Sequence, residues 1–152
     1  MKNIFLISLA LSLLSCNKDN DELKMLISGT NNQGLSYNKN RLFSANDIDG
    51  VNNRIIVYDY ETMGIIKDNT ILALGHGAGM EFSDKENLLY VTNGIQGVLS
   101  HVYTIDIQSE KPTIQRDYNL ENLGDSACIS LDDENNIFYI ISSFSGNQVY
   151  QL

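Results

Sequence analysis

Hydrophobic and polar positions follow one pattern in the first sixteen residues and another in the rest of the chain. From Ile4 to Leu14 the chain is apolar apart from two serines. After Cys16 the apolar residues come in short runs, many alternating with polar residues and separated by Asp, Asn and Gly. Such runs predict β-strands joined by tight turns. No segment after Cys16 shows a sustained helical period, so we expect almost no helix.

The strand-forming region also repeats itself. Residues 78–91 align without a gap on residues 127–140, at a shift of 49 residues, with apolar positions on apolar positions and an acidic turn on a similar turn. A shift of 47 residues places Asn46 on Asn93 and Asp59 on Asp106. The chain therefore contains about two and a half copies of a unit of about 45 to 50 residues.

Each copy has room for four short strands. In the clearest copy they are predicted around residues 80–82, 88–91, 101–106 and 113–118. Four antiparallel strands in a repeat of this length are typical of one β-propeller blade. The sequence thus predicts an all-β fold of four-stranded blades, at about residues 33–74, 75–120 and 121–152. An immunoglobulin-like sandwich is the alternative, although it does not require the repeat.

These blades form an incomplete propeller. Closed propellers have four to eight blades, so about three blades cannot form a ring. They leave unpaired strand edges and an exposed blade face. Either the chain is a truncated reading frame, which we expect, or a partner or self-association through the open blade edges completes it.

The N-terminal segment has the features of an export signal. Lys2 precedes the apolar run, which would form a helix about half as long as a membrane span. The run ends in Leu13-Leu14-Ser15-Cys16, which resembles the lipobox of bacterial lipoproteins. The resemblance implies that residues 1–15 are a signal peptide and that lipid on Cys16 attaches the protein to a membrane.

The residues after Cys16 indicate where this lipoprotein goes. Residues 17–22 are polar and acidic, and they resemble the export signal that follows the lipidated Cys in surface lipoproteins of Bacteroidota. We expect residues 16–32 to be a flexible tether and the protein to lie in the cell envelope, at the outer membrane. The resemblance implies surface exposure, and a plain spacer on a periplasm-facing lipoprotein is the alternative.

The net charge limits the kinds of partner that the chain can bind, and the cysteine content limits its disulfides. The formal net charge is -9, so nucleic acid is excluded as a partner and anionic headgroups would repel the chain. Membrane attachment must then come from the lipid. With Cys16 acylated, Cys128 has no internal partner, and its place in an apolar strand predicts a small buried residue.

One segment resembles a known repeat family. Residues 82–94 read FSDKENLLYVTNG, similar to the YVTN-type propeller repeat, in which an apolar residue, Ser and Asp precede Tyr-Val-Thr-Asn. This repeat occurs in lactonase-like seven-bladed propellers and in surface proteins. The resemblance is clearest over residues 75–106 and weaker over 124–143, and it implies a propeller fold without specifying a reaction.

Candidate site residues lie in or beside the loops that a propeller gathers on one face near its central channel. The candidate catalytic residues are His76, Glu81 and Asp125, and the candidate binding residues are Asn93 and His76. A His with carboxylates is suited to general-base catalysis or to binding a divalent metal. The alternative, which we favour, is a glycine-rich turn at residues 75–79 with His76 simply solvated. The sequence predicts no cofactor and no metal site.

These observations predict a binding or interaction module that contacts a protein or glycan ligand through the loop face. A truncated lactonase-like hydrolase is one alternative, implied only by the family resemblance, and its site would need the missing blades. An inactive gene remnant is the other.

Overall fold

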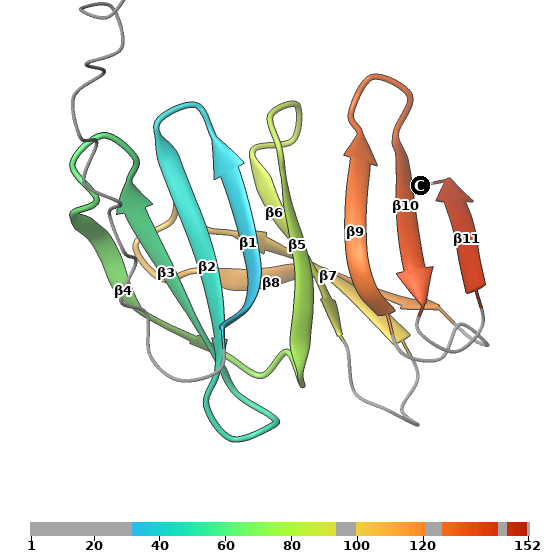
Figure 1. Cartoon of the computed structure of the whole chain (residues 1–152), viewed down its shortest axis with the longest axis horizontal. Coiled ribbons are helices and arrows are strands. Elements are labelled where there is room, and N and C mark those ends of the chain that lie inside the picture. Colours follow the sequence, from blue (N-terminus) through green and yellow to red (C-terminus); the bar gives the residue numbers. More distant parts are fainter. Residues whose placement is uncertain (1–31, 94–99, 121–125, 143–145, 152) are drawn as a thin grey trace, which may run out of the picture.

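Eleven β-strands make up the regular structure in the described part of the chain. The computed structural model describes residues 32–93, 100–120, 126–142 and 146–151 (Figure 1). The signal segment, Cys16 and the tether, apart from residue 32, lie outside these residues. The described residues include no helix long and apolar enough to cross a membrane.

The strands form three antiparallel sheets in chain order. The first sheet contains β1 (Asn32–Asn38), β2 (Arg41–Asp47), β3 (Asn53–Asp59) and β4 (Ile65–Leu72). The second contains β5 (Gly77–Ser83), β6 (Leu88–Asn93), β7 (Ser100–Asp106) and β8 (Thr113–Leu120). The third contains β9 (Ser126–Asp132), β10 (Ile137–Ser142) and β11 (Gly146–Gln151). Neighbouring strands in each sheet are consecutive in sequence, which confirms the predicted antiparallel blades.

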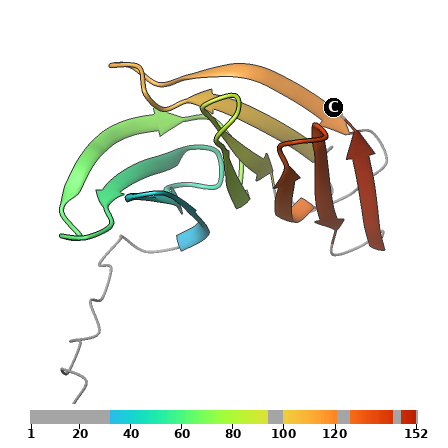
Figure 2. The same cartoon turned by 90° about the horizontal axis from the view of Figure 1, so that it is seen from above.

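The three sheets stack side by side in an arc, as blades do in a propeller (Figure 2). Strands β1, β5 and β9 lie next to one another, and each begins its own sheet (Figure 1). The described strands do not close a ring, so the predicted incomplete propeller is confirmed.

Period-2 alternation in the second sheet supplies two separate cores. Leu89 and Val91 pack with Phe43 and Phe82 between the first and second sheets. The two phenylalanine rings stack with their centroids 5.1 Å apart. Tyr90 points the other way, into the core between the second and third sheets. Successive residues of one strand point to opposite faces, so the second sheet joins both neighbours.

The turns of the second and third sheets confirm the 49-residue repeat in detail. Asn87 and Asn136 end equivalent turns with positive φ angles of 59° and 56°. Asparagine tolerates this left-handed conformation better than most residues. The Glu86 N–H donates to Ser83 Oγ at 3.0 Å, and in the next copy the Asn135 N–H donates to an Asp132 carboxylate oxygen at 3.2 Å. These bonds are local, so short turn sequences suffice to form them.

Cys128 differs from its prediction, because it is exposed rather than buried. It pairs with Ile141, which is also exposed, on the face of the third sheet that points away from the second. The sequence therefore describes the apolar character of β9 correctly, although Cys128 is not buried. Its burial would require another sheet on that face.

The core between the first and second sheets leads to a stability prediction. Leu89→Ala removes a fully buried side chain and should lower the free energy of unfolding by about 2–5 kcal/mol. Ile114→Ala on β8 is the matched control, because Ile114 is exposed, and it should cost under about 1 kcal/mol. Urea unfolding of the full chain in detergent, followed by circular dichroism, measures both values. Equal losses would contradict this account of the core.

Candidate functional site on the loop face

The stack of sheets has two rims of different character. One rim, here called the loop face, carries the connections β2–β3 and β4–β5, which lie at the bottom of Figure 1. The opposite rim, the turn face, carries the tight turns β1–β2, β5–β6 and β9–β10 at the top of Figure 1. The sequence places its candidate residues at the loop face.

His76 lies on the loop face with an acidic partner that sequence analysis missed. Its Nδ1 atom is 2.7 Å from Oδ2 of Asp47, the last residue of β2. Asp47 is buried, whereas His76 is partly exposed. The other carboxylate oxygen of Asp47 accepts a hydrogen bond from the Gly50 N–H at 2.7 Å. Asp47 therefore orients the His76 ring and also fixes the loop that follows β2.

The β2–β3 loop, residues 48–52, is held in one shape by hydrogen bonds. Asp49 accepts bonds from the N–H groups of Val51 and Asn52 and from the Asn52 side chain. These bonds, led by the one from the Asn52 backbone, hold the pKa of Asp49 below its usual value. The loop thus keeps two exposed aliphatic side chains, Ile48 and Val51, at the rim.

The glycine-rich turn before β5 ties this loop to the next sheet. The Gly75 N–H donates to the Val51 carbonyl at 2.9 Å, and the buried Asn53 side chain donates to the Gly75 carbonyl. Gly75 has φ +67°, a conformation that glycine adopts without strain. The turn is shorter than the expected 75–79, because β5 begins at Gly77. It places His76 against Asp47 at the end of β2, so the expectation that His76 is simply solvated is wrong.

Glu81 is not brought to His76. It lies on β5, five residues further along and about 16 Å away at strand spacing. Its pair partner Tyr90 faces the third sheet, and burial followed by the charge of Asp133 raises the pKa of Glu81. These contacts place Glu81 between sheets rather than on the loop face.

Asn93 ends β6 as a buried residue, and its side chain is hydrogen-bonded to the Tyr103 hydroxyl. Burial, followed by the charge of Asp117, raises the pKa of Tyr103, and the bond from Asn93 partly offsets this rise. Asn93 therefore joins β6 to β7. Asp125, the last sequence candidate, lies outside the described residues.

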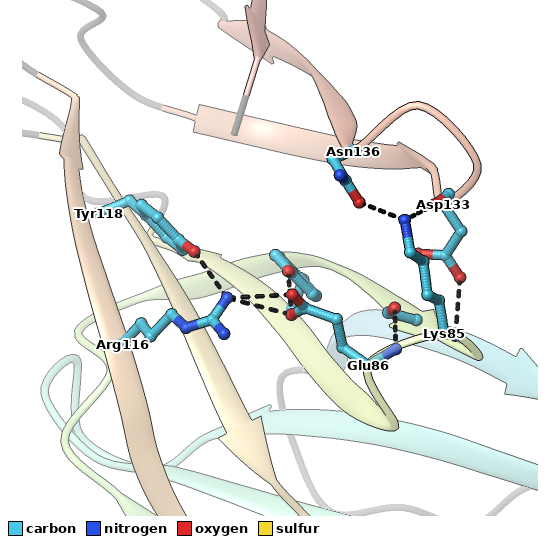
Figure 3. Close-up of polar contacts among 8 residues, drawn as sticks. Lys85, Glu86, Arg116, Tyr118, Asp133 and Asn136 are labelled. Atoms are coloured by element: carbon cyan, nitrogen blue, oxygen red, sulfur yellow. Dashed lines mark hydrogen bonds and ion pairs between the residues drawn. The ribbon is translucent and has the colours of Figure 1, made fainter.

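The turn face carries a second polar cluster, in a cleft between the second and third sheets (Figure 3). The cleft has a volume of about 220 Å³. Arg116 Nη1 lies 3.1 and 3.2 Å from the two carboxylate oxygens of Glu86 and donates to the Tyr118 hydroxyl at 3.1 Å. The Tyr90 hydroxyl donates to Glu86 at 2.7 Å. Burial and then Glu86 raise the pKa of Tyr90 well above its usual value.

Beside this cleft, two neighbouring turns are locked together. An Asp133 carboxylate oxygen accepts a hydrogen bond from the Asp84 N–H at 2.8 Å. Lys85 Nζ donates to the Asp133 carbonyl at 3.2 Å and to Asn136 Oδ1 at 2.7 Å (Figure 3). The described residues include no group of three or more His, Cys, Asp or Glu placed to hold a metal ion. The cluster on the turn face thus joins sheets, whereas the loop face presents the exposed pair Ile48 and Val51 near His76.

Comparison with known proteins gives no family. No family model and no curated protein matches the chain. Among solved structures, the chain is similar to the crystal structure of the computationally designed Ika4 protein, at 16% identity and a TM-score of 0.49, covering 88% of this chain and 99% of that one. It is also similar to the structure of the Dos1 propeller, at 7% identity and a TM-score of 0.42. That match covers 79% of this chain and 41% of the Dos1 chain.

The Asp49 bonds lead to a prediction about acid stability. Because the pKa of Asp49 is lowered in the folded state, the unfolded chain takes up the proton first as the pH falls. The stability from Asp49 is therefore present above its ordinary pKa of 3.8 and is lost as the pH falls through the lower, folded-state value. Asp49→Asn should destabilise the protein near neutral pH, and the difference from wild type should shrink by about pH 3. Urea unfolding at both pH values measures it, and a constant difference would contradict the prediction.

Proposed function

We propose that this protein is a lipid-anchored binding module of the bacterial cell envelope that recognises another protein through its loop face. The observation that carries the proposal is the fixed β2–β3 loop. It presents Ile48 and Val51, which are 51% and 57% exposed, next to the Asp47–His76 pair. An exposed apolar pair beside a polar group is the composition of a small protein-binding surface.

The rigidity of the loop supports binding. The N–H groups of Gly50, Asn52 and Gly75 donate hydrogen bonds that already hold the loop, so binding would cost little conformational entropy. The exposed groups are aliphatic, which suits an apolar side chain of a protein partner better than a sugar ring, because sugars stack on aromatic faces. Since Nδ1 of His76 faces Asp47, Nε2 is the ring atom that a partner would contact.

The anchor in this proposal comes from the sequence. An apolar signal of export length, a Cys16 at its end and an acidic segment after it support lipid attachment in the envelope. Two or more acyl chains hold a protein at a membrane stably. A tethered module meets other envelope proteins at a high effective concentration, so a small contact surface suffices.

Lipid attachment is tested in a Gram-negative host that expresses the full chain with its own signal. The wild type should be found in the membrane fraction, with acyl chains on Cys16 identified by mass spectrometry, and Cys16→Ala should lose both. Cys128→Ala is the matched control and should keep the lipid and the membrane association. Acylation of neither cysteine, or membrane association unchanged in Cys16→Ala, would contradict the anchor.

Recognition through the loop face is tested by photocrosslinking in the native cells. A benzophenone amino acid at position 48 should crosslink a discrete envelope protein. The same group at position 113, an exposed site on β8, should not. Val51→Asp should remove the crosslink because it places a charge in the apolar contact. Identical crosslinks from positions 48 and 113, or no protein crosslink from position 48, would refute the proposed surface.

A further inference from the structure

Each sheet has one face that points toward the following sheet in chain order. Side chains at equivalent positions on this face are buried in the first two sheets and exposed in the third. The repeat makes Phe43, Tyr90 and Tyr139 equivalent, and likewise Ala45, Thr92 and Ile141. In the first two sheets these side chains are at most 1% exposed. In the third sheet Tyr139 and Ile141 are 43% and 50% exposed. The third sheet therefore has the face of a blade that another blade should cover.

Strand β1 shows the same difference on the opposite face of the first sheet. Leu35 and Tyr37 on β1 are equivalent to Met80 and Phe82 on β5. Met80 and Phe82 pack against the first sheet and are 4% and 8% exposed. Leu35 and Tyr37 are 60% and 52% exposed. On the same face Leu42, Ile56 and Tyr58 are buried, so the exposed part of this face is the β1 strand. Strand β1 at one end of the stack and the third sheet at the other thus expose complementary parts of the contact that joins neighbouring sheets within the chain.

We infer that a second copy of this chain covers both faces, with the third sheet of each copy packed against the first sheet of the other. Two such contacts related by a twofold axis close a ring of six blades, within the four to eight that propellers use. Each contact continues the stacking already seen between β1 and β5 and between β5 and β9. The inference does not rest on the loop-face function.

Charges at the turn face favour this occupant. Within the chain, Lys39 lies 3.6 Å from Asp84 of the next turn, and Lys85 is bonded to the turn after that. Glu134 occupies the place of Lys85 in the third sheet. In the ring, Glu134 would face the turn of the other copy that carries Lys39 and Arg41. The acidic turn of one copy would thus meet the basic turn of the other. The attraction between these charges favours the approach of the third sheet of one copy to the first sheet of the other.

A specific pair of residues follows from the stacking within the chain. Gly34 on β1 lies so close to β5 that an added Cβ would be 3.1 Å from Met80 Cγ. The repeat and strand register make Gly34 equivalent to Cys128, and Met80 equivalent to Leu35. Cys128 of one copy should therefore lie against Leu35 of the other. Both residues are exposed in the single chain.

The test is Leu35→Cys in the full chain, oxidised in membranes with copper phenanthroline and air. Its new thiol and the native Cys128 should form an intermolecular disulfide, giving a band at twice the chain mass on a non-reducing gel. A closed two-copy ring gives this band without a higher ladder, because both disulfides join the same two chains. A ladder would overturn the closed ring in favour of an open filament.

Two control variants make the result specific. Thr113 is exposed on the outer strand β8, so Thr113→Cys should give no disulfide-linked dimer. The double variant Leu35→Cys with Cys128→Ser should give none either, because it lacks the native thiol. Adding Ile141→Glu to Leu35→Cys should also abolish the dimer, because the new charge lies within the proposed contact between copies. The single chain should still fold, because Ile141 is exposed in it. A folded, monomeric Leu35→Cys protein after oxidation would overturn the inference and assign the faces to further blades or to another protein.

Discussion

The packing of each sheet between two neighbours is the interaction on which the rest of this structure depends. A sheet of alternating side chains has two faces to bury. Among the described residues, the second sheet packs one face against the first sheet and the other against the third, whereas the third sheet leaves Tyr139 and Ile141 exposed on one face. Leu89 faces the first sheet and Tyr90 the third, and both are almost fully buried. Burial of one such side chain contributes about 1.5–3 kcal/mol, so an uncovered face such as that of Tyr139 forfeits a substantial part of the stability that its sequence offers.

Sheet stacking also decides where chemistry can occur. On the turn face, Asp133 and Lys85 lock adjacent turns together, and Arg116 and Glu86 are engaged with each other and with tyrosines. On the loop face, Asp47 at the end of β2 meets His76 from the connection between the first and second sheets. The turn face therefore maintains the spacing of the blades, while the loop face presents exposed groups such as Ile48 and Val51.

Much of the fold could be predicted from the sequence, and less of the candidate site. Strand positions, the four-stranded units and the equivalent turns ending at Asn87 and Asn136 followed from alternation and repetition. The sequence placed His76 among glycines in a turn before β5, but it predicted a solvated side chain and missed the partner Asp47. The two residues are 29 positions apart, and only the β2–β3 and β4–β5 connections bring them within 2.7 Å.

The sequence by itself determined the features that depend on neighbours along the chain. Alternation set which side chains share a face, and side chains such as Asp132 closed turns by bonding N–H groups three residues away. Only the tertiary structure decided which faces of the sheets are covered. Cys128 shows this, because its strand is as apolar as a buried strand and yet the Cys128 side chain is exposed. Burial depends on whether another sheet lies against that face, and side chains carry no local signal of whether that sheet is present.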